Sequence, residues 1–372
     1  MLSLLVLLAS LPISLALTSD NPQTLGSLVI LDTGVGHRST PVPRWRTSLR
    51  SLTTRGTNAT ILRQFGPEIT PGSSAEPILA KSLAYSPSTS SLYSATGQGI
   101  IRTDVDGSNP KVVVAQNSSQ ITSLTVAKKE GKLYYGTLFD GLIRRADLDG
   151  LNVEVVRNVS QGINYSPYFS SAYSYADGLL VDDDKGWLYW SASEGPDSGS
   201  VRRAPLHFEG QEQVLASGIN MPGQLRLVGD SLYWTEKGRW SNSPTAIKRF
   251  DLSQLRKSPP QPQPPSPTAP PVAFATQTVV HSNQSTSIFF EKDYTGDEQT
   301  LSIQSFVVYR DEVEQKVWFV VQSSGRTMFG KLVEITWRGS GDGRKAELKV
   351  LTENTEDVGV PVGLEYVKSR EL

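Results

Sequence analysis

Residues 92–109 read LYSATGQGIIRTDVDGSN, and residues 133–152 read LYYGTLFDGLIRRADLDGLN. Each stretch runs from an aromatic-rich segment through a Gly-containing turn to an Ile-Arg segment, and then into an Asp-x-Asp-Gly turn. Aromatic and β-branched residues favour strands, and Asp-Gly and Asn tolerate the positive φ of tight turns. Each stretch therefore predicts two antiparallel strands and the turn that leads to a third.

The same unit recurs along the middle of the chain. Its aromatic segment begins at Leu92, Leu133, Leu188 and Leu232, so the intervals are 41, 55 and 44 residues. An apolar segment containing a leucine precedes each of them. A period of about 40–45 residues is typical of four-stranded propeller blades. We interpret the repeat as a series of blades with one insertion.

The two ends of the chain supply two more blades. Residues 306–309 and 317–321 predict the first two strands of a sixth unit. Residues 27–32, 49–52 and 60–63 predict the second, third and fourth strands of the first unit, and residues 361–367 predict its missing first strand. Pairing the two ends leaves no open sheet edge in the ring. The prediction is an all-β fold: a six-bladed β-propeller of four-stranded antiparallel blades, with the ring closed by the N- and C-terminal strands.

The alternative is a pair of β-sandwiches. Sandwiches also consist of short antiparallel strands with turn residues between them. They do not explain the repeated order of strand, turn and strand, and they do not explain a blade divided between the two ends of the chain.

The segment Tyr233-Trp234-Thr235-Glu236 resembles the Y-W-T-D strand of low-density lipoprotein receptor class B repeats, within the TolB-like six-bladed propellers. The Ile-x-Arg segments and the Leu-Asp-Gly turn of residues 148–150 also follow that pattern. The resemblance implies the propeller fold. The aspartate of the family pattern is replaced in the clear repeats, by Thr96, Thr137, Ala192 and Glu236. The hydrogen bonds that this aspartate makes between blades in the family therefore cannot be assumed here.

The N-terminus predicts export from the cell. Residues 1–16 are apolar and end in Ser-Leu-Ala, which is typical of a cleaved signal peptide, although a buried strand or a membrane anchor is the alternative. We expect residues 17–372 to form one secreted, extracellular and monomeric domain. The sequence has five Asn-x-Ser/Thr glycosylation motifs, at Asn58, Asn117, Asn158, Asn164 and Asn283.

Composition excludes several classes of site. The chain has no cysteine, so it has no disulfides, cysteine nucleophiles or thiolate metal sites. Its 36 basic and 37 acidic residues give no reason to expect a nucleic acid or an anionic membrane as partner. The proline-rich segment 258–271 would usually indicate a domain linker. Because it falls between the predicted third and fourth strands of the fifth blade, we interpret it as a polyproline II-like loop insertion.

The predicted binding surface lies at one end of the central channel. Loops that join second to third strands and fourth to first strands share that end of a propeller. Long loops with aromatic and arginine residues are typical of binding surfaces. The alternative is that these loops bind no ligand and simply cover the mouth of the channel and pack on each other. The candidate binding residues in these loops are Arg44, Trp45, Arg46, Tyr165, Tyr168, Glu236, Arg239 and Trp240.

Two functions are compatible with this fold. The first is an extracellular binding or scaffold module that engages a protein or glycan and has no cofactor. The second is a metal-dependent lactonase, which is implied by similarity to gluconolactonase-like propellers that hold a cation in the channel. Under that alternative Ca²⁺ would be the cofactor, and Asp177 and Glu365 are candidate oxygen ligands. Three or more carboxylate or amide groups converging in the channel would favour the lactonase.

Overall fold

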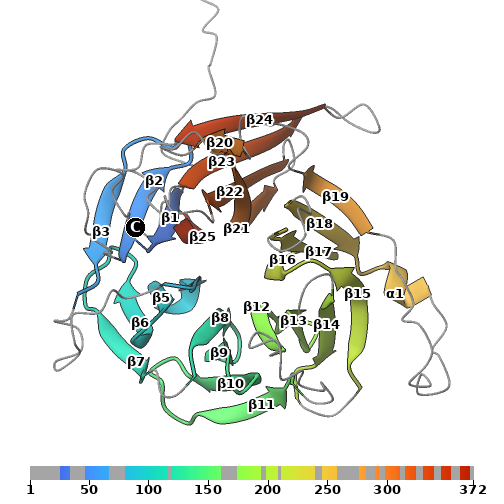
Figure 1. Ribbon diagram of the computed structural model, residues 1–372. Coiled ribbons are helices and arrows are strands. Elements are labelled where there is room, and N and C mark those ends of the chain that lie inside the picture. The colour runs from blue at the N-terminus through green and yellow to red at the C-terminus, as the bar shows by residue number, and fades with distance from the viewer. Residues whose placement is uncertain are drawn as a thin grey trace, which may run out of the picture.

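Six sheets form a ring around a central channel (Figure 1). The structure, a computed structural model, describes residues 26–33, 47–66, 80–115, 119–160, 174–193, 198–207, 211–238, 245–257, 276–281, 290–292, 298–310, 315–323, 330–338, 345–352 and 361–368. The predicted signal peptide lies outside the described residues. The first strand of each blade lies nearest the channel, and the fourth lies on the outer rim.

The first three blades follow the predicted order of strands. Blade 1 consists of β25 (Pro361–Val367), β1 (Ser27–Asp32), β2 (Ser48–Thr53) and β3 (Thr60–Gln64). Blade 2 consists of β4 (Ser82–Ser86), β5 (Ser91–Thr96), β6 (Gly99–Asp104) and β7 (Lys111–Ala115), with the short 3-10 helix η2 (Pro87–Thr89) after β4. Blade 3 consists of β8 (Ile121–Ala127), β9 (Lys132–Thr137), β10 (Leu142–Asp147) and β11 (Glu154–Asn158).

Blades 4 to 6 also have four main strands each, and the sheet of blade 6 has one additional short strand. Blade 4 consists of β12 (Tyr175–Asp182), β13 (Trp187–Ser193), β14 (Gly199–Pro205) and β15 (Gln213–Ile219). Blade 5 consists of β16 (Pro222–Val228), β17 (Ser231–Glu236), β18 (Ala246–Asp251) and β19 (Thr276–His281), with the one-turn helix α1 (Gln254–Lys257) after β18. Blade 6 consists of β21 (Glu298–Arg310), β22 (Gln315–Ser323), β23 (Gly330–Arg338) and β24 (Lys345–Thr352), and the short strand β20 (Phe290–Lys292) pairs with the start of β21.

The two ends of the chain close the ring as predicted. Strand β25 pairs antiparallel with β1, and Val29 lies opposite Glu365, Ile30 opposite Leu364 and Leu31 opposite Gly363. The C-terminal segment is thus the innermost strand of a sheet that the N-terminal segment begins. Blade 1 therefore has four strands, as blades 2 to 5 do.

The proline-rich segment 258–271 lies outside the described residues, but both of its flanks are placed. Strand β18 precedes it, β19 follows it, and the two strands pair with each other, Ile247 opposite Val280. The segment therefore leaves and re-enters a single sheet.

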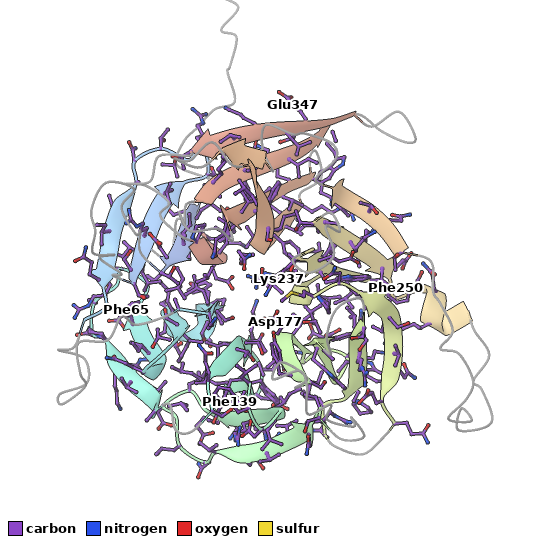
Figure 2. All side chains as sticks on the ribbon, in the orientation of Figure 1. Phe65, Phe139, Asp177, Lys237, Phe250 and Glu347 are labelled. Atoms are coloured by element: carbon purple, nitrogen blue, oxygen red, sulfur yellow. The ribbon has the colours of Figure 1, made fainter. Side chains whose placement is uncertain are left out.

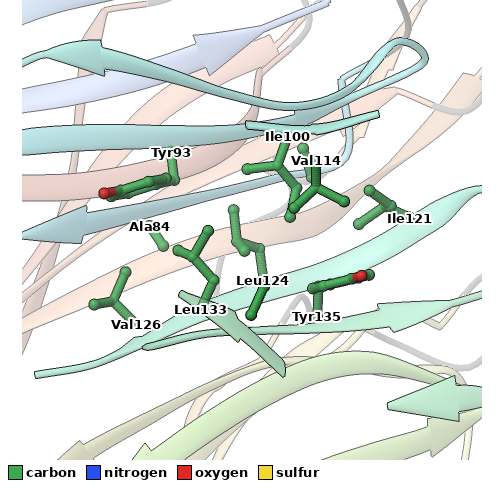
Figure 3. Packing of buried hydrophobic residues seen from close by; sticks show 11 residues of the cluster. Ala84, Tyr93, Ile100, Val114, Ile121, Leu124, Val126, Leu133 and Tyr135 are labelled. Carbon is green, nitrogen blue, oxygen red and sulfur yellow. The ribbon is translucent and has the colours of Figure 1, made fainter. Parts of the chain in front are cut away.

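The core consists of apolar clusters between adjacent blades. Figure 3 shows the cluster in which Tyr93 and Ile100 of blade 2 pack with Leu124 and Leu133 of blade 3. A second cluster joins Trp318 of blade 6 to Leu28 and Ile30 of blade 1. Because a single blade cannot bury its apolar faces alone, its stability depends on its neighbours.

The Asp-Gly turns bring adjacent blades together at the outer rim. Gly107 has a φ of +83° and Gly150 a φ of +88°, which is the left-handed region that favours glycine. A Cβ at Gly107 would lie 2.5 Å from the carbonyl oxygen of Leu62 in blade 1, and a Cβ at Gly150 would meet the carbonyl of Val113 in blade 2. Each glycine therefore permits both the turn and a close contact with the preceding blade.

Near the channel, side chains other than the family aspartate join adjacent blades. Thr96 and Thr137, which stand in its place, donate to the carbonyl oxygens of Gly99 and Leu142 in their own blades. The bonds between blades have other donors: Thr122 and Ser123 donate to Ala176, Ser191 donates to Gly223, and Ser305 and the backbone N–H of Phe306 donate to Gln224.

Candidate functional site

The central channel narrows to a small polar cavity between the inner strands. The cavity has a volume of about 40 Å³, and its polar lining includes Lys81, Asp177, Gln224, Arg226, Lys237 and Gln304. A water molecule requires a cavity of at least about 10–15 Å³, whereas small-molecule sites are typically about 300–1,000 Å³. Within the described part of the chain, this cavity has room for a few water molecules and is smaller than typical small-molecule sites.

An ion pair links two blades at one mouth of the channel. Lys237 Nζ lies 2.6 Å from Asp177 Oδ2, and the two side chains are only 16% and 12% exposed. Figure 2 shows both residues at the centre of the ring. Lys237 follows the end of β17, where its backbone N–H donates to Met221, and a Cβ at Gly223 would lie 2.8 Å from the Lys237 side chain. Gly223 therefore leaves room for the lysine to reach blade 4.

A second cation joins three blades deeper in the channel. Arg226 of blade 5 donates from Nε to the carbonyl oxygen of Phe306 in blade 6, at 3.0 Å. Its Nη2 donates to the carbonyl oxygen of Leu364 and to Oε1 of Glu365 in blade 1, both at 2.8 Å. Sequence analysis did not single out Arg226. The available signal was the alternation of Gln224 and Arg226 with apolar residues along an inner strand.

The environment of Glu365 favours its neutral form. Burial raises the pKa of this carboxyl, and the nearby Arg226 opposes that shift without cancelling it. The side chain is 11% exposed. At neutral pH, therefore, a Glu365 carboxylate in the channel depends on Arg226 for compensation.

The channel carboxylates do not converge as the lactonase alternative requires. Asp177 pairs with Lys237 and Glu365 pairs with Arg226, so each predicted oxygen ligand already faces a cation. Among the described residues, no group of three or more acidic or histidine side chains is placed to share a metal ion. The residues present here fit an internally neutralised channel better than an oxygen-ligated Ca²⁺ site.

Most of the predicted binding residues lie outside the described residues. These are Arg44, Trp45, Arg46, Tyr165, Tyr168, Arg239 and Trp240. The strands that flank them are placed, however. Their connections run between β1 and β2, between β11 and β12, and between β17 and β18, which all open at the same end of the ring. We call this end, where Lys237 meets Asp177, the loop face.

Glu236 is the predicted binding residue whose position is described. It is the last residue of β17 and lies opposite Ala246 of β18. Trp234 Nε1 donates to its carboxyl at 3.3 Å, and burial raises its pKa although Lys248 acts in the opposite direction. The hydrogen bond from Trp234 therefore fixes this carboxyl against its own strand, at the end of β17 that lies at the loop face.

Sequence analysis missed an aromatic residue on the loop face. Phe139, in the connection between β9 and β10, is 55% exposed (Figure 2). The predicted binding residues lie in long loops, whereas the connection that contains Phe139 is short. The signal that could have identified it is a large apolar residue at the tip of a predicted hairpin turn, next to Asp140 and Gly141.

Two of the five glycosylation motifs have described asparagines. Asn58 lies in the turn between β2 and β3 with a φ of +56°, on the end of the ring opposite the loop face. Asn158 is the last residue of β11, at the loop face. Both are exposed. Asn117, Asn164 and Asn283 lie outside the described residues, and glycosylation itself stays a prediction.

Comparisons with known proteins agree with the fold. No family model matches the sequence. Over 170 residues the chain is 30% identical to a protein of Pyricularia oryzae named low-density lipoprotein receptor-related protein 1, a match that covers 42% of this chain and 54% of the relative. The match thus spans about half the length of that relative. A chain in the crystal structure of a nidogen/laminin complex has a TM-score of 0.54 and 10% sequence identity, covering 91% of this chain and 97% of that one.

None of the helices in the described part of the chain is long and apolar enough to cross a bilayer. The strand order, the closure of the ring, the repeat and the partial similarity to the receptor-related protein agree with one another. The chain is a six-bladed β-propeller, and over 42% of its length it is similar to the receptor-related protein.

Proposed function

We propose that the protein is an extracellular binding module whose loop face engages a protein ligand. The main supporting observation is the ion pair between Lys237 and Asp177. It holds the start of one predicted binding connection, residues 237–245, beside the strand that follows another, residues 159–174. Two connections that carry candidate contact residues are therefore fixed around one channel mouth, on rigid blades. Binding loops held by a rigid scaffold are typical of recognition domains.

The comparisons support a protein ligand over a small molecule. The relative with partial similarity is named as a receptor-related protein, and the structural neighbour comes from a complex of two proteins. The channel cavity of about 40 Å³ does not accommodate an ordinary metabolite. Contact with a macromolecule at the mouth of the channel requires no large cavity.

The proposal can be tested with purified extracellular matrix proteins, beginning with laminin, by biolayer interferometry on the secreted protein. Arg46→Ala and Trp240→Ala should each weaken binding of a matrix protein at least tenfold, because central aromatic and arginine contacts contribute about 2 kcal/mol or more. Arg310→Ala is the matched control, since Arg310 is exposed and ends β21 at the opposite end of the ring.

The control variant should bind as the unchanged protein does. Binding that is insensitive to both loop-face variants, or that is lost in Arg310→Ala, would contradict the assignment of this face. The absence of binding to every protein in the panel would count against a matrix protein as ligand.

A further inference from the structure

The short connection between β9 and β10 is a rigid turn on the loop face. The backbone N–H of Phe139 donates to Ser119 Oγ at 2.9 Å, and the N–H of Leu138 donates to the carbonyl oxygen of Gln120 at 2.8 Å. The hydroxyl of Ser119 in turn donates to Asp140 at 3.2 Å. Residues 138–141, which we call the Phe139 turn, are thus fastened to the segment that precedes β8.

An ion pair fixes the other side of the Phe139 turn. Arg144 Nη2 lies 2.6 Å from Asp140 Oδ2, and Arg144 Nη1 donates to Thr137 at 2.6 Å. Although burial opposes the shift, hydrogen bonds from Arg144 and Thr137 lower the pKa of Asp140, so this carboxylate is ionised at neutral pH. The turn holds Phe139 in place while 55% of its surface stays exposed.

Described residues that belong to, or flank, three of the five glycosylation motifs lie beside this turn. Ser119 is the third residue of the Asn117 motif. Asn158 lies opposite Leu142 in the sheet, and the next residue donates its backbone N–H to the carbonyl oxygen of Gly141 at 2.8 Å. The connection that contains Asn164 also begins and ends beside Gly141, because a Cβ there would lie 2.7 Å from Ser160 and 2.6 Å from Ser174.

The described asparagine of this group is oriented for modification. Asn158 is exposed, and its Oδ1 accepts hydrogen bonds from the backbone N–H of Ser160 at 2.9 Å and from the hydroxyl of Ser160 at 2.6 Å. These bonds occupy the oxygen of the amide. An Asn-linked sugar is attached to the amide nitrogen, which they leave aside.

The exposed ring lies within reach of a sugar on Asn158. Phe139 is three residues from Leu142, which spans at most about 10 Å of chain, and Leu142 is the cross-strand partner of Asn158. Partner residues on antiparallel strands have Cα atoms about 4.5–5.5 Å apart. The apolar face of a sugar can remove aromatic surface from water without desolvating its hydroxyl groups.

We propose that the loop face has a glycan-bearing sector at blade 3, in which an Asn-linked glycan on Asn158 packs against Phe139. The protein ligand then occupies the other sector of the face, over blades 5, 6 and 1, where the connections of Arg46 and Trp240 begin. This inference rests on the proposed extracellular function, since Asn-linked glycans are added to exported proteins.

The first test is the occupancy of Asn158, measured by glycopeptide mass spectrometry on protein secreted from a eukaryotic host. The second test compares thermal unfolding of the unchanged protein and Phe139→Ala, each before and after enzymatic removal of the glycans. Phe139→Ala should lower the melting temperature by about 1–3 °C in the glycosylated protein, and by less than about 0.5 °C in the deglycosylated protein.

Leu151→Ala is the matched control for this comparison. Leu151 is 63% exposed and lies in the turn between β10 and β11, at the opposite end of the same blade. Its substitution should have the same effect with and without glycans.

An unoccupied Asn158 in the secreted protein, or an equal effect of Phe139→Ala in both forms, would overturn the inference. Weaker ligand binding by Phe139→Ala in the deglycosylated protein would also overturn it, because the ring would then contact the ligand. The glycopeptide and melting measurements require no ligand, so their failure is distinct from a failure of the proposed binding function.

Discussion

The outer rim and the central channel differ in how adjacent blades contact each other. At the outer rim, Gly56, Gly107 and Gly150 place the turns of blades 1, 2 and 3 against blades 6, 1 and 2. Near the channel, side chains of blades 3 to 6 donate to or accept from adjacent blades, and Arg226 and Ser305 each contact two blades beyond their own. The regular turns repeat a sequence motif, whereas the channel contacts come from individual side chains.

The rim turns belong to the repeated framework of the ring, whereas the channel contacts belong to the candidate site. The rim turns of blades 1 to 3 need the same small residue at the position of positive φ, so they recur in the sequence. The channel contacts are made by four individual side chains that do not repeat from blade to blade: Lys237, Asp177, Arg226 and Glu365. The variants below test the rim contacts and the channel contacts separately.

The largest effect is expected at the deepest channel contact. Arg226→Met removes three hydrogen bonds and leaves Glu365 buried without its cation, so the free energy of unfolding should fall by about 3–5 kcal/mol. Urea denaturation measures this change. Arg310→Met is the surface control and should change stability by less than about 0.5 kcal/mol. A loss below about 1 kcal/mol in Arg226→Met would show that this contact does not hold the three blades together.

A rim glycine should have the next largest effect. Gly107→Ala combines a strained positive φ with a collision at Leu62, and should cost about 2–4 kcal/mol. Gly131→Ala is the matched control, because Gly131 has a φ of +63° but no atom within 4 Å of its Cβ position. The control should cost only about 1–2 kcal/mol. Equal losses in both variants would mean that the contact between blades contributes nothing beyond backbone strain.

The channel contact also predicts a dependence on pH. Burial raises the pKa of Glu365 above its value in the unfolded chain, so protonation favours the folded state and stability falls as the pH rises through the raised value. Arg226→Met removes the cation that opposes this shift, so the pKa of Glu365 should rise further.

Between the pKa values of Glu365 in the two proteins, the stability deficit of Arg226→Met should therefore shrink by about 1.4 kcal/mol for each unit that the pH falls. The measurement is urea denaturation from pH 4 to pH 8. The double variant Arg226→Met/Glu365→Gln should show a deficit that does not vary with pH. A deficit in Arg226→Met that grows on acidification would contradict the assignment to Glu365.

The ion pair at the channel mouth should have a smaller effect on stability. Lys237→Met keeps the apolar stem but leaves Asp177 without its partner, and should cost about 1–2 kcal/mol, as an unpaired and largely buried charge. Adding Asp177→Asn should restore part of this loss. Thermal unfolding of the three variants gives the comparison, and a double variant less stable than Lys237→Met would show that the two side chains do not act as a pair.

Added Ca²⁺ should have the smallest effect. A ligand that binds only the folded state raises the melting temperature, and at 100 times its Kd it contributes about 2.7 kcal/mol. Because Asp177 and Glu365 each face a cation, millimolar Ca²⁺ should shift the melting temperature by less than about 1 °C. A larger shift, together with turnover of a lactone, would restore the hydrolase alternative.

The frame could be predicted from sequence because its physical signals repeat. The aromatic strands starting at Leu92 and Leu133 and the Asp-Gly turns after them identify blades, and the incomplete blade at each end identifies how the ring closes. Strand β20 was not predicted, because three residues carry no alternation pattern that distinguishes a strand from a loop.

The candidate site could be predicted only in part. Asp177 and Glu365 were noted as candidate oxygen ligands, but their partners, Lys237 and Arg226, depend on how distant inner strands align across the ring. Glu236 was predicted as a binding residue and its role in binding stays a prediction, whereas the hydrogen bond that its carboxyl accepts from Trp234 of its own strand was not foreseen. Arg226 was missed because nothing in a single inner strand indicates that its side chain will meet two other blades.

The most direct test of the account is a cross-link between the two ends of the chain, which the absence of cysteine makes simple. Ser27 of β1 and Val367 of β25 are Cα partners, at a separation that permits a disulfide. The double variant Ser27→Cys/Val367→Cys should form an intramolecular disulfide in nearly every molecule under mild oxidation, detected by peptide mass spectrometry. Free thiols, or disulfides only between separate molecules, would contradict the closed six-bladed ring on which the loop face depends.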